Sequence, residues 1–328
     1  MRIIAVLGGG NSSEFDISVK SATEVAKALT GRYTTYLVMI KGNDWYWEDP
    51  QGRAVAIDKN SFTLTLHNRV VRFDAVFIVI HGTPGENGLL QGYFDMLAIP
   101  YAGCDAFCSA LTFNKQATKA WLREYDIPMA RSVLFRKGET RDSAKLLSVT
   151  GLPCFVKPNN SGSSFGVSIV SAPEELNGAI DNALKESDEV LIEWLMKGTE
   201  VACGVVKTQS VQRALPVTEI RSKNAFFDFE AKYDPTKADE ITPAEIEPEV
   251  YSKVQSLSSD IYDLLGCRGL VRVDFIIVDK TPMFLEINTI PGLTAESILP
   301  KQIAASGMEA ADLYSLIIED LFNQTSRG

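Results

Sequence analysis

Residues 271–288 read VRVDFIIVDKTPMFLEIN, and this stretch decides the fold. Two apolar runs flank the tetrapeptide DKTP, which is typical of the turn of a β-hairpin. Side chains alternate between the faces of a strand, so Arg272 and Asp274 share one face of the first strand. By the same rule, Glu286 and Asn288 share one face of the second strand. The sequence therefore predicts that the side chains of Asp274, Glu286 and Asn288 converge on one side of the hairpin.

These three side chains are candidate metal ligands. Carboxylates that lie close together in a buried setting repel each other unless a cation lies among them. Carboxylate and amide oxygens are hard ligands and favour Mg²⁺ or Mn²⁺. The alternative is a solvated face of an antiparallel sheet, but such a face usually carries more lysine and threonine.

The composition indicates an ordinary globular protein. The 328 residues are 45% hydrophobic and 23% charged, a length that suits two or three domains. The net charge of −10, without a basic run, argues against general nucleic-acid binding. Apolar runs are too short for a membrane span, and we see no signal-peptide cleavage region. Five scattered cysteines without a CxxC pair predict reduced, mostly buried thiols in a cytosol.

Strand and helix signals alternate over the first hundred residues, which predicts a parallel α/β sheet with shorter β segments inserted at 45–72. A helical stretch follows at 106–125. Beyond it, β-rich segments alternate with helices expected at 173–186, 249–265 and 313–322. We therefore expect an N-terminal α/β domain (1–103), a central part (104–190) and a C-terminal part (191–328).

A lysine and a Gly/Ser loop lie between two strands at 155–167, which read FVKPNNSGSSFGV. Backbone N–H groups of small residues can approach phosphate oxygens, and Lys157 would add a positive charge there. The loop is not a P-loop, because GxxxxGK[ST] is absent. A plain hairpin turn is the alternative.

Residues 190–200 read VLIEWLMKGTE, an apolar strand that runs into a short connector between Glu193 and Glu200. A strand-like connector of this kind can hold adenine through backbone groups, and a carboxylate can accept protons from ribose hydroxyls. Taken alone, the segment is better interpreted as a surface turn.

Two loops follow strands of the N-terminal part, at 8–14 and at 81–88. Loops at the carboxyl ends of parallel strands carry sites in open α/β sheets, so both should open on the same edge. The first loop has Ser13 where GxGxxG requires glycine, so a dinucleotide fingerprint is not supported. His81 by itself is interpreted as a structural histidine.

Six segments, in order, resemble the D-alanine–D-alanine ligases of the ATP-grasp superfamily. The resemblance covers nearly the whole chain and implies an N-terminal Rossmann-like parallel-sheet domain, followed by an ATP-grasp fold of two subdomains. The segments are GGGNSSEFDIS at 8–18, HGTPGENGLLQGYFDMLAIPYAG at 81–103, VKPNNSGSSFG at 156–166, EAKY at 230–233, RVDF at 272–275 and LEINTIPGLTAESILP at 285–300.

The resemblance implies an ATP site built from cationic side chains, the small-residue loop and the connector. Its residues would be Lys115, Lys157, Ser163, Ser164, Glu193, Leu195, Met196, Glu200, Lys232 and Asn288. It also implies two Mg²⁺ (or Mn²⁺) ions on Asp274, Glu286 and Asn288, in agreement with the strand argument.

The resemblance also implies sites for two substrates. Glu14 would receive the ammonium of the first, and Ser163 and Tyr233 would hydrogen-bond with Glu14. Ile17 and His81 would lie near this substrate. Arg272 and the backbone N–H of Gly292 would bind the oxyanion, and Ser297 and Ile298 would hold the second substrate's carboxylate. Phe227 and Phe229 replace frequent tyrosines, and Asn114 replaces a usual aspartate; these departures concern loop closure.

The expected activity is ligation of two D-alanine molecules by ATP through an acyl phosphate, for peptidoglycan precursors, by a cytoplasmic homodimer. Such chemistry requires charge neutralisation, positioning and exclusion of water, and we expect a lid at about 222–240. A ligase that makes D-Ala-D-Ser, D-Ala-D-Lac or another dipeptide is the nearest alternative, which Tyr233 and Ser297 disfavour. A non-catalytic nucleotide-binding protein and a nicotinamide-dependent oxidoreductase are weaker alternatives.

Overall fold

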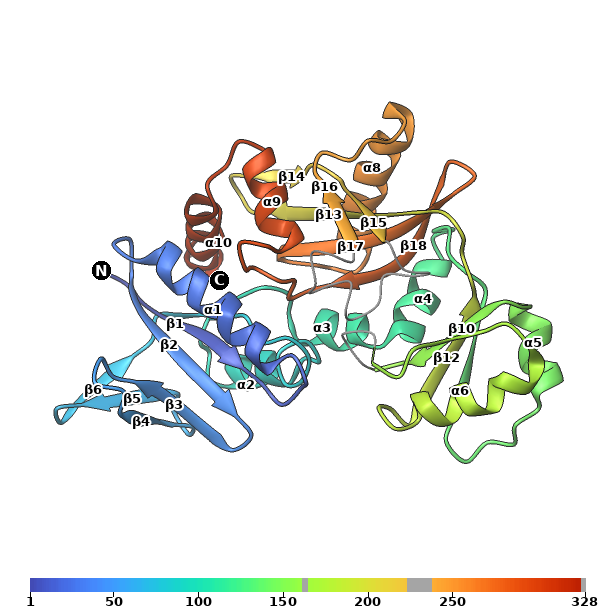
Figure 1. Cartoon of the computed structure of the whole chain (residues 1–328). Helices are drawn as coiled ribbons and strands as arrows, with labels where there is room; N and C mark the ends of the chain where they lie inside the picture. Colours follow the sequence, from blue (N-terminus) through green and yellow to red (C-terminus); the bar gives the residue numbers. More distant parts are fainter. Residues whose placement is uncertain (161–164, 223–237, 326–328) are drawn as a thin grey trace.

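The computed structural model describes residues 1–160, 165–222 and 238–325, which form three β-sheets with helices packed on them (Figure 1). This mixed α/β architecture confirms the predicted fold class. Some predicted features lie outside the described residues: Ser163, Ser164, Lys232, Tyr233, Phe227, Phe229 and most of the expected lid.

The N-terminal part is built on a mixed sheet with the strand order β6-β5-β4-β3-β2-β1-β7-β8. Its strand β1 is parallel to both β2 and β7, and the antiparallel strands β3 to β6 extend one edge where inserted β segments were expected. The strands are β1 (Ile3–Gly9), β2 (Thr34–Lys41), β3 (Asp44–Glu48), β4 (Ala54–Asp58), β5 (Thr63–Leu66), β6 (Arg69–Arg72), β7 (Ala75–Ile78) and β8 (Tyr101–Ala102).

Strand β1 is apolar throughout because both of its faces are covered. Ile4 and Val6 belong to one core, whereas Ala5 and Leu7 belong to another on the opposite face. Helix α1 (Phe15–Leu29) lies so close to β1 that a Cβ at Gly8 would lie 2.8 Å from the Ala22 Cβ. This close packing fixes the loop between β1 and α1, which carries Glu14.

The helical stretch expected at 106–125 is two helices, α3 (Ala106–Phe113) and α4 (Lys115–Arg123). Asn114 has an extended backbone between them, and its side chain accepts a hydrogen bond from the Ala117 N–H at 2.8 Å. An asparagine that caps the second helix therefore interrupts the predicted continuous helix and places Lys115 at a helix start.

The central sheet is antiparallel, with the order β11-β10-β12-β9. Strand β12 lies wholly within it, so the division expected near 190 falls inside a strand, and the chain passes to the next sheet between Trp194 and Thr199. The elements are β9 (Ser132–Arg136), α5 (Ser143–Thr150), β10 (Cys154–Pro158), β11 (Ser168–Val170), the 3₁₀ turn η1 (Pro173–Glu175), α6 (Leu176–Ala183) and β12 (Glu189–Trp194).

The C-terminal sheet is also antiparallel and contains the predicted hairpin as β17 and β18. Asp279 and Lys280 form its turn with φ of 47° and 63°, the left-handed pair that a tight type I′ turn requires. The described order is β16-β15-β13-β17-β18, with β14 beside β13. The elements are β13 (Thr199–Lys207), β14 (Gln212–Ala214), β15 (Thr218–Ser222), β16 (Ala238–Ile241), α8 (Pro248–Leu264), β17 (Gly269–Val278), β18 (Thr281–Asn288) and α9 (Ile298–Ala305).

The last helix, α10 (Ala310–Thr325), returns to the N-terminal sheet and lies beside α1 and β8 (Figure 1). Its Leu313, Tyr314 and Ile317 join the same apolar core as Ile4 and Val6 of β1. Another helix, α2 (Leu89–Met96), packs against α3. Among the described residues, no helix is both long and apolar enough to cross a bilayer.

Candidate active site

The paired strands β17 and β18 place Asp274 opposite Glu286 and Arg272 opposite Asn288. The Arg272 guanidinium donates to both oxygens of Asp274, with Nε–Oδ1 and Nη2–Oδ2 distances of 2.8 and 2.7 Å. Asn288 Nδ2 donates to Asp274 Oδ2 at 3.1 Å. The structure thus brings these four side chains together on one face of the hairpin.

The donor set of this face fits a divalent cation. Two carboxylates lie opposite each other on neighbouring strands, and an amide flanks them, which are the hard oxygens that Mg²⁺ takes. Asp274 is nearly fully buried, so its negative charge requires partners, and it has Arg272 and Asn288. The residues that would hold the ion are Asp274, Glu286 and Asn288.

Lys115 reaches the same face from helix α4, with its Nζ 3.9 Å from Glu286 Oε2. Its backbone N–H donates to the carbonyl of Asn159, which follows β10. The first turn of α4 is thereby joined to the start of the segment that carries the small-residue loop.

Glu86 is a half-buried carboxyl that the sequence interpretation did not single out. Burial, and next the nearby Glu14 carboxylate, raise its pKa to about 8, although the Gly82 N–H and Lys115 act to lower the pKa. The Gly82 N–H donates to Glu86 Oε2 at 2.6 Å. The sequence feature that could have identified Glu86 is its place in a loop at the carboxyl end of a parallel strand.

His81 is buried, and its Nδ1 lies 2.8 Å from the carbonyl oxygen of Ile290. A carbonyl only accepts hydrogen bonds, so Nδ1 carries a proton. Burial lowers the pKa of His81, and Arg272 lowers it further, against the opposite effect of Glu14. The neutral imidazole therefore has Nε2 as an acceptor, and this atom has no hydrogen-bond partner within the described residues.

Glu14 and Ile17 stand at the start of α1. Glu14 is buried just before the first turn, and Ile17 is half-buried within that turn. The Glu14 carboxylate acts on the pKa of both His81 and Glu86, so the two N-terminal loops contribute side chains to one site.

Gly292 and Ser297 lie together in the loop between β18 and α9. A Cβ at Gly292 would come within 2.8 Å of Ser297 Oγ, so a larger residue would displace the hydroxyl. Ser297 is the N-cap residue of α9 and Ile298 begins the helix. The N–H groups at a helix start bind anions such as a substrate carboxylate.

Lys157 forms a buried ion-pair group with Glu193 and Lys119. Lys157 Nζ lies 2.5 Å from Glu193 Oε1, and Lys119 Nζ lies 2.6 Å from Oε2. Lys119 and Glu193 therefore form a close, buried ion pair. Burial acts to raise the pKa of Glu193, but the two lysines outweigh it and lower the pKa to about 2. The sequence interpretation missed Lys119, which stands one helical turn after Lys115.

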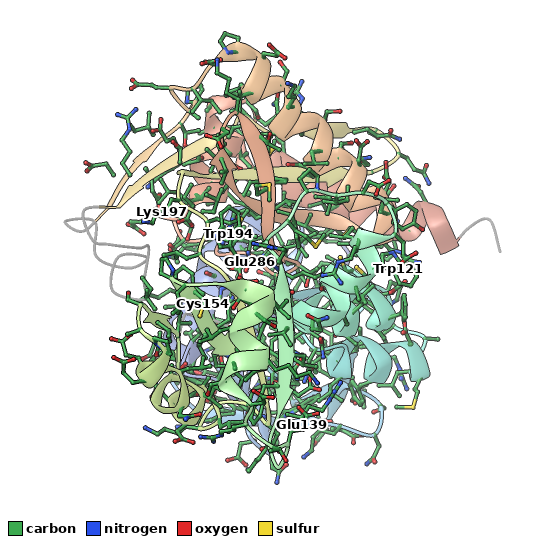
Figure 2. All side chains as sticks on the ribbon, turned by 90° about the vertical axis from the view of Figure 1, so that its right-hand side faces the viewer. Trp121, Glu139, Cys154, Trp194, Lys197 and Glu286 are labelled. Atoms are coloured by element: carbon green, nitrogen blue, oxygen red, sulfur yellow. The ribbon has the colours of Figure 1, made fainter. Side chains whose placement is uncertain are left out.

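The connector 195–198 joins the central and C-terminal sheets. The Leu195 N–H donates to the Pro153 carbonyl at 3.3 Å. Met196, the next residue, is half-buried. Glu200 pairs with Ile276 in the ladder between β13 and β17. In Figure 2, Trp194 and Glu286 lie in the middle of the view, between the C-terminal sheet above and the central part below.

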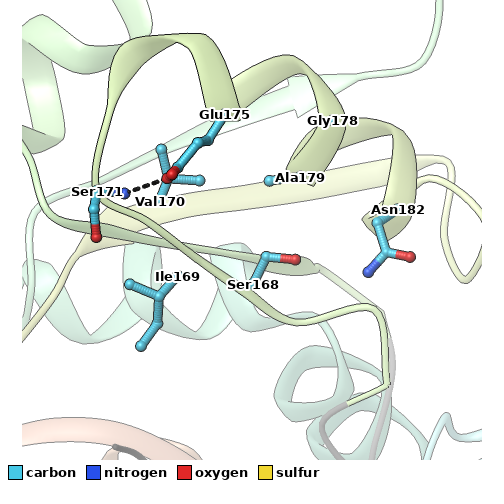
Figure 3. Close-up of a pocket in the computed structure, with 8 residues that line it drawn as sticks. All are labelled: Ser168, Ile169, Val170, Ser171, Glu175, Gly178, Ala179 and Asn182. Carbon is cyan, nitrogen blue, oxygen red and sulfur yellow. Dashed lines mark hydrogen bonds between the residues drawn. The ribbon is translucent and has the colours of Figure 1, made fainter.

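A separate shallow cavity of about 380 Å³ lies between β11 and α6 (Figure 3). Its Glu175 carboxylate accepts hydrogen bonds from the N–H groups of Ser171 and Ala172, at 2.8 and 3.2 Å. None of its eight lining residues is a predicted site residue, so this cavity is distinct from the acidic face of the hairpin.

Two sheets joined by a short connector, with the acidic hairpin face between them, form the ATP-grasp architecture. A family model described as "D-ala D-ala ligase N-terminus" matches residues 3–104, and one described as "D-ala D-ala ligase C-terminus" matches residues 121–319. The chain therefore belongs to the D-alanine–D-alanine ligase family.

Three similar proteins illustrate this membership. The D-alanine–D-alanine ligase of Phocaeicola vulgatus is 45% identical over 98% of this chain and 99% of its own length. The crystal structure of the VanG D-Ala:D-Ser ligase from Enterococcus faecalis is 30% identical, with a TM-score of 0.86 over 98% of this chain and 99% of that one. A D-alanine–D-alanine ligase from Bacillus anthracis, solved in complex with ATP, is 27% identical, with a TM-score of 0.79 over all of both chains.

Proposed function

We propose that this protein joins two D-alanine molecules into D-alanyl-D-alanine at the expense of ATP, for peptidoglycan precursors. The observation that carries the proposal is the hairpin face, where Arg272 and Asp274 lie opposite Asn288 and Glu286. The family membership supports the reaction class, and the described site supplies the charges that the reaction requires.

The first step would transfer the γ-phosphoryl group of ATP to the carboxylate of the first D-alanine, with release of ADP. Both reactants are anions, so the step depends on charge neutralisation and positioning. Lys115 and Arg272 provide positive charge near the acidic face. Magnesium bound by Asp274, Glu286 and Asn288 would neutralise phosphate charge and orient the phosphates.

In the second step, the amine of the second D-alanine would attack the acyl carbon, and the bond to phosphate would break as inorganic phosphate leaves. Arg272 and the Gly292 N–H would stabilise the oxyanion of the tetrahedral intermediate. Glu14 would bind the first ammonium, and His81 Nε2 would accept a hydrogen bond from a substrate N–H. The roles of Ser163, Lys232 and Tyr233 stay predictions from the resemblance.

The second substrate would place its carboxylate at the start of α9. Ser297 Oγ lies 2.8 Å from Thr294 Oγ1, and the first turn of the helix offers N–H donors beside Ile298. This site would recognise the carboxylate of the second substrate. The attacking group would then be the amine of D-alanine or of a close analogue.

For ATP, we propose that Lys157 faces the phosphates, and that the connector residues Leu195 and Met196 and the carboxylate of Glu200 hold the adenosine. The Glu193 carboxylate would hold Lys157 in place, because their charged atoms already lie 2.5 Å apart. Lys119 would keep this buried carboxylate ionised.

The second candidate is a D-Ala:D-Ser ligase, because a structure with that printed activity is among the similar ones. The test is mass spectrometry of products after incubation with ATP, magnesium, D-alanine, D-serine and D-lactate together. We expect D-Ala-D-Ala to dominate near neutral pH. A dominant mixed product would replace the D-alanine assignment, and no ADP release with any of the three would contradict a ligase.

We also propose a cytoplasmic homodimer formed through the N-terminal part. Leu89 and Met96 of α2 and Phe107 of α3 are large apolar side chains exposed on helices that pack together. Sedimentation velocity would show a dimer, and a monomer at micromolar concentration would contradict this proposal.

A further inference from the structure

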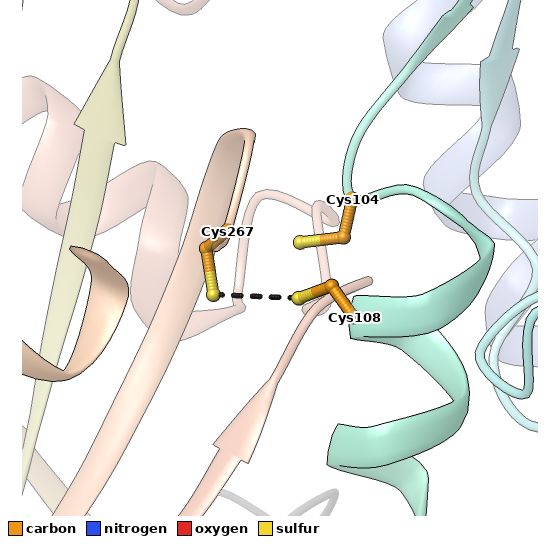
Figure 4. A group of neighbouring side chains, drawn as sticks. All are labelled: Cys104, Cys108 and Cys267. Atoms are coloured by element: carbon orange, nitrogen blue, oxygen red, sulfur yellow. Dashed lines mark hydrogen bonds between the residues drawn. The ribbon is translucent and has the colours of Figure 1, made fainter. Parts of the chain in front are cut away.

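Three cysteines from distant parts of the sequence meet in a buried cluster that the ligase reaction does not use. They are Cys104 after β8, Cys108 in the first turn of α3, and Cys267 between α8 and β17. Their side chains point toward one another (Figure 4), and their sulfurs all lie within 4.8 Å of one another.

The spacing of the sulfurs suits a shared metal ion. Zn–S bonds of about 2.3 Å at a tetrahedral angle place two sulfurs about 3.8 Å apart. The Cys108 and Cys267 sulfurs are 3.7 Å apart, so these ligands need little movement to bind one ion. Sulfurs bonded to each other would have to approach to about 2 Å instead.

The surroundings also suit sulfur ligands. Leu122, Ile127 and Val271 belong to the same apolar cluster, which excludes water from the thiols. The Arg268 N–H donates to Cys104 Sγ at 3.4 Å, a contact that favours a thiolate. A thiolate is the form that binds metals.

We propose that Cys104, Cys108 and Cys267 form a structural site for a soft, thiophilic divalent cation of the Zn²⁺ type. The ion would fasten the segment that leaves the N-terminal part to the turn before β17, where Cys267 lies five residues before Arg272. Hard ions such as Mg²⁺ do not favour three sulfur ligands, so this site is chemically distinct from the oxygen face of the hairpin.

The test uses the full-length protein, reduced and then dialysed with Zn²⁺ or with Mg²⁺ alone. We expect one tightly held Zn²⁺ per chain by elemental analysis, a thiolate-to-metal absorption band when Cd²⁺ replaces Zn²⁺, and a higher Tm with Zn²⁺ than with Mg²⁺. Each readout is independent of ligase activity.

Cys267→Ala should weaken Zn²⁺ binding by at least about tenfold, since even groups that only support a metal ligand contribute that much. Cys154→Ala is the matched control, because Cys154 is equally buried but lies in the core of the central sheet. It should keep the metal and the Cd²⁺ band. If Cys267→Ala does not fold, the Cd²⁺ titration of the unaltered protein still decides the matter.

Two outcomes would overturn the proposal. One is an unaltered, reduced protein that retains no Zn²⁺ and shows no Cd²⁺ band. The other is metal retention that is equal in Cys267→Ala and in the Cys154→Ala control. A chain isolated without metal and lighter by two hydrogens would identify the cluster as a disulfide site and would likewise reject it.

Discussion

At the scale of single residues, the hairpin face depends on one guanidinium. Arg272 donates to both oxygens of Asp274, and no lysine could reproduce this planar fork. The same group lies near enough to His81 to lower the pKa of the imidazole. Arg272 therefore both neutralises a buried carboxylate and helps to keep a neighbouring histidine neutral.

Arg272→Ala should reduce turnover by at least about 100-fold, the scale for the loss of one charge-stabilising group. Coupled measurement of ADP release with D-alanine checks this expectation. Arg213→Ala is the control, because Arg213 is an exposed arginine on strand β14, which pairs with β13 and not with β17. Turnover within threefold of normal in Arg272→Ala would contradict the assigned role.

Glu86 should make stability depend on pH. Its pKa in the folded protein is raised to about 8, so the folded state holds a proton that the unfolded state releases at a lower pH. The contribution of Glu86 is therefore full at acid pH and is lost as the pH rises from about 4.3 through 8. Glu86→Gln, which cannot ionise, should flatten this loss.

Urea unfolding at pH 6 and at pH 9 measures the effect. The difference between the two free energies of unfolding should be smaller in Glu86→Gln than in the unaltered protein. Glu139→Gln, at an exposed carboxylate in the loop after β9, serves as control and should leave the difference unchanged. An equal pH dependence in all three proteins would show that the folded protein does not hold a proton on Glu86.

At the scale of elements, the short helix α4 presents Lys115 to the hairpin face. Its N-cap residue, Asn114, also accepts a hydrogen bond from Asn159 Nδ2 at 3.0 Å, which joins the helix to the end of β10. One side chain therefore starts the helix and fixes its distance from the segment that leads to the small-residue loop.

Asn114→Ala should cost about 0.5–2 kcal/mol of stability and should also raise the KM for ATP, because Lys115 loses its anchor. Asp142→Ala is the matched control, since Asp142 caps α5 by the same kind of bond to the Lys145 N–H. Both variants should lose similar stability in urea unfolding. An unchanged KM for ATP in Asn114→Ala would show that the Asn114 cap does not contribute to ATP binding.

At the scale of the whole molecule, the two ends of the chain share one core. Helix α10 packs on α1, and Ile290, which follows β18, lies in the core on the opposite face of the N-terminal sheet. The Ile290 carbonyl also accepts from His81, so the C-terminal part holds the histidine of an N-terminal loop in place. The site is thus assembled by contacts between parts distant in sequence.

Leu313→Ala, in the middle of this shared core, should lower stability by about 2–5 kcal/mol. Asn323→Ala, on an exposed position of the same helix, should change it by less than about 0.5 kcal/mol. Urea unfolding followed by tryptophan fluorescence compares the two, because the tryptophans at 45 and 47 report on the N-terminal sheet. Equal effects would show that α10 is not part of the core.

The sequence by itself determined the mixed α/β class, the hairpin, and the common face of Asp274, Glu286 and Asn288. These follow from the two-residue alternation of strands and from local turn chemistry, which depend on near neighbours only. The resemblance added the family, which the comparisons confirm.

Only the tertiary structure decided the rest. No local pattern shows that Lys119 pairs with Glu193, that Glu86 lies near the charges of Glu14 and Lys115, or that Cys267 meets Cys104 and Cys108. Each of these facts depends on packing between segments separated by tens to hundreds of residues. Burial changes the free energy of a charge or thiol only after those segments have met. A local sequence pattern therefore cannot predict the effect of burial on these groups.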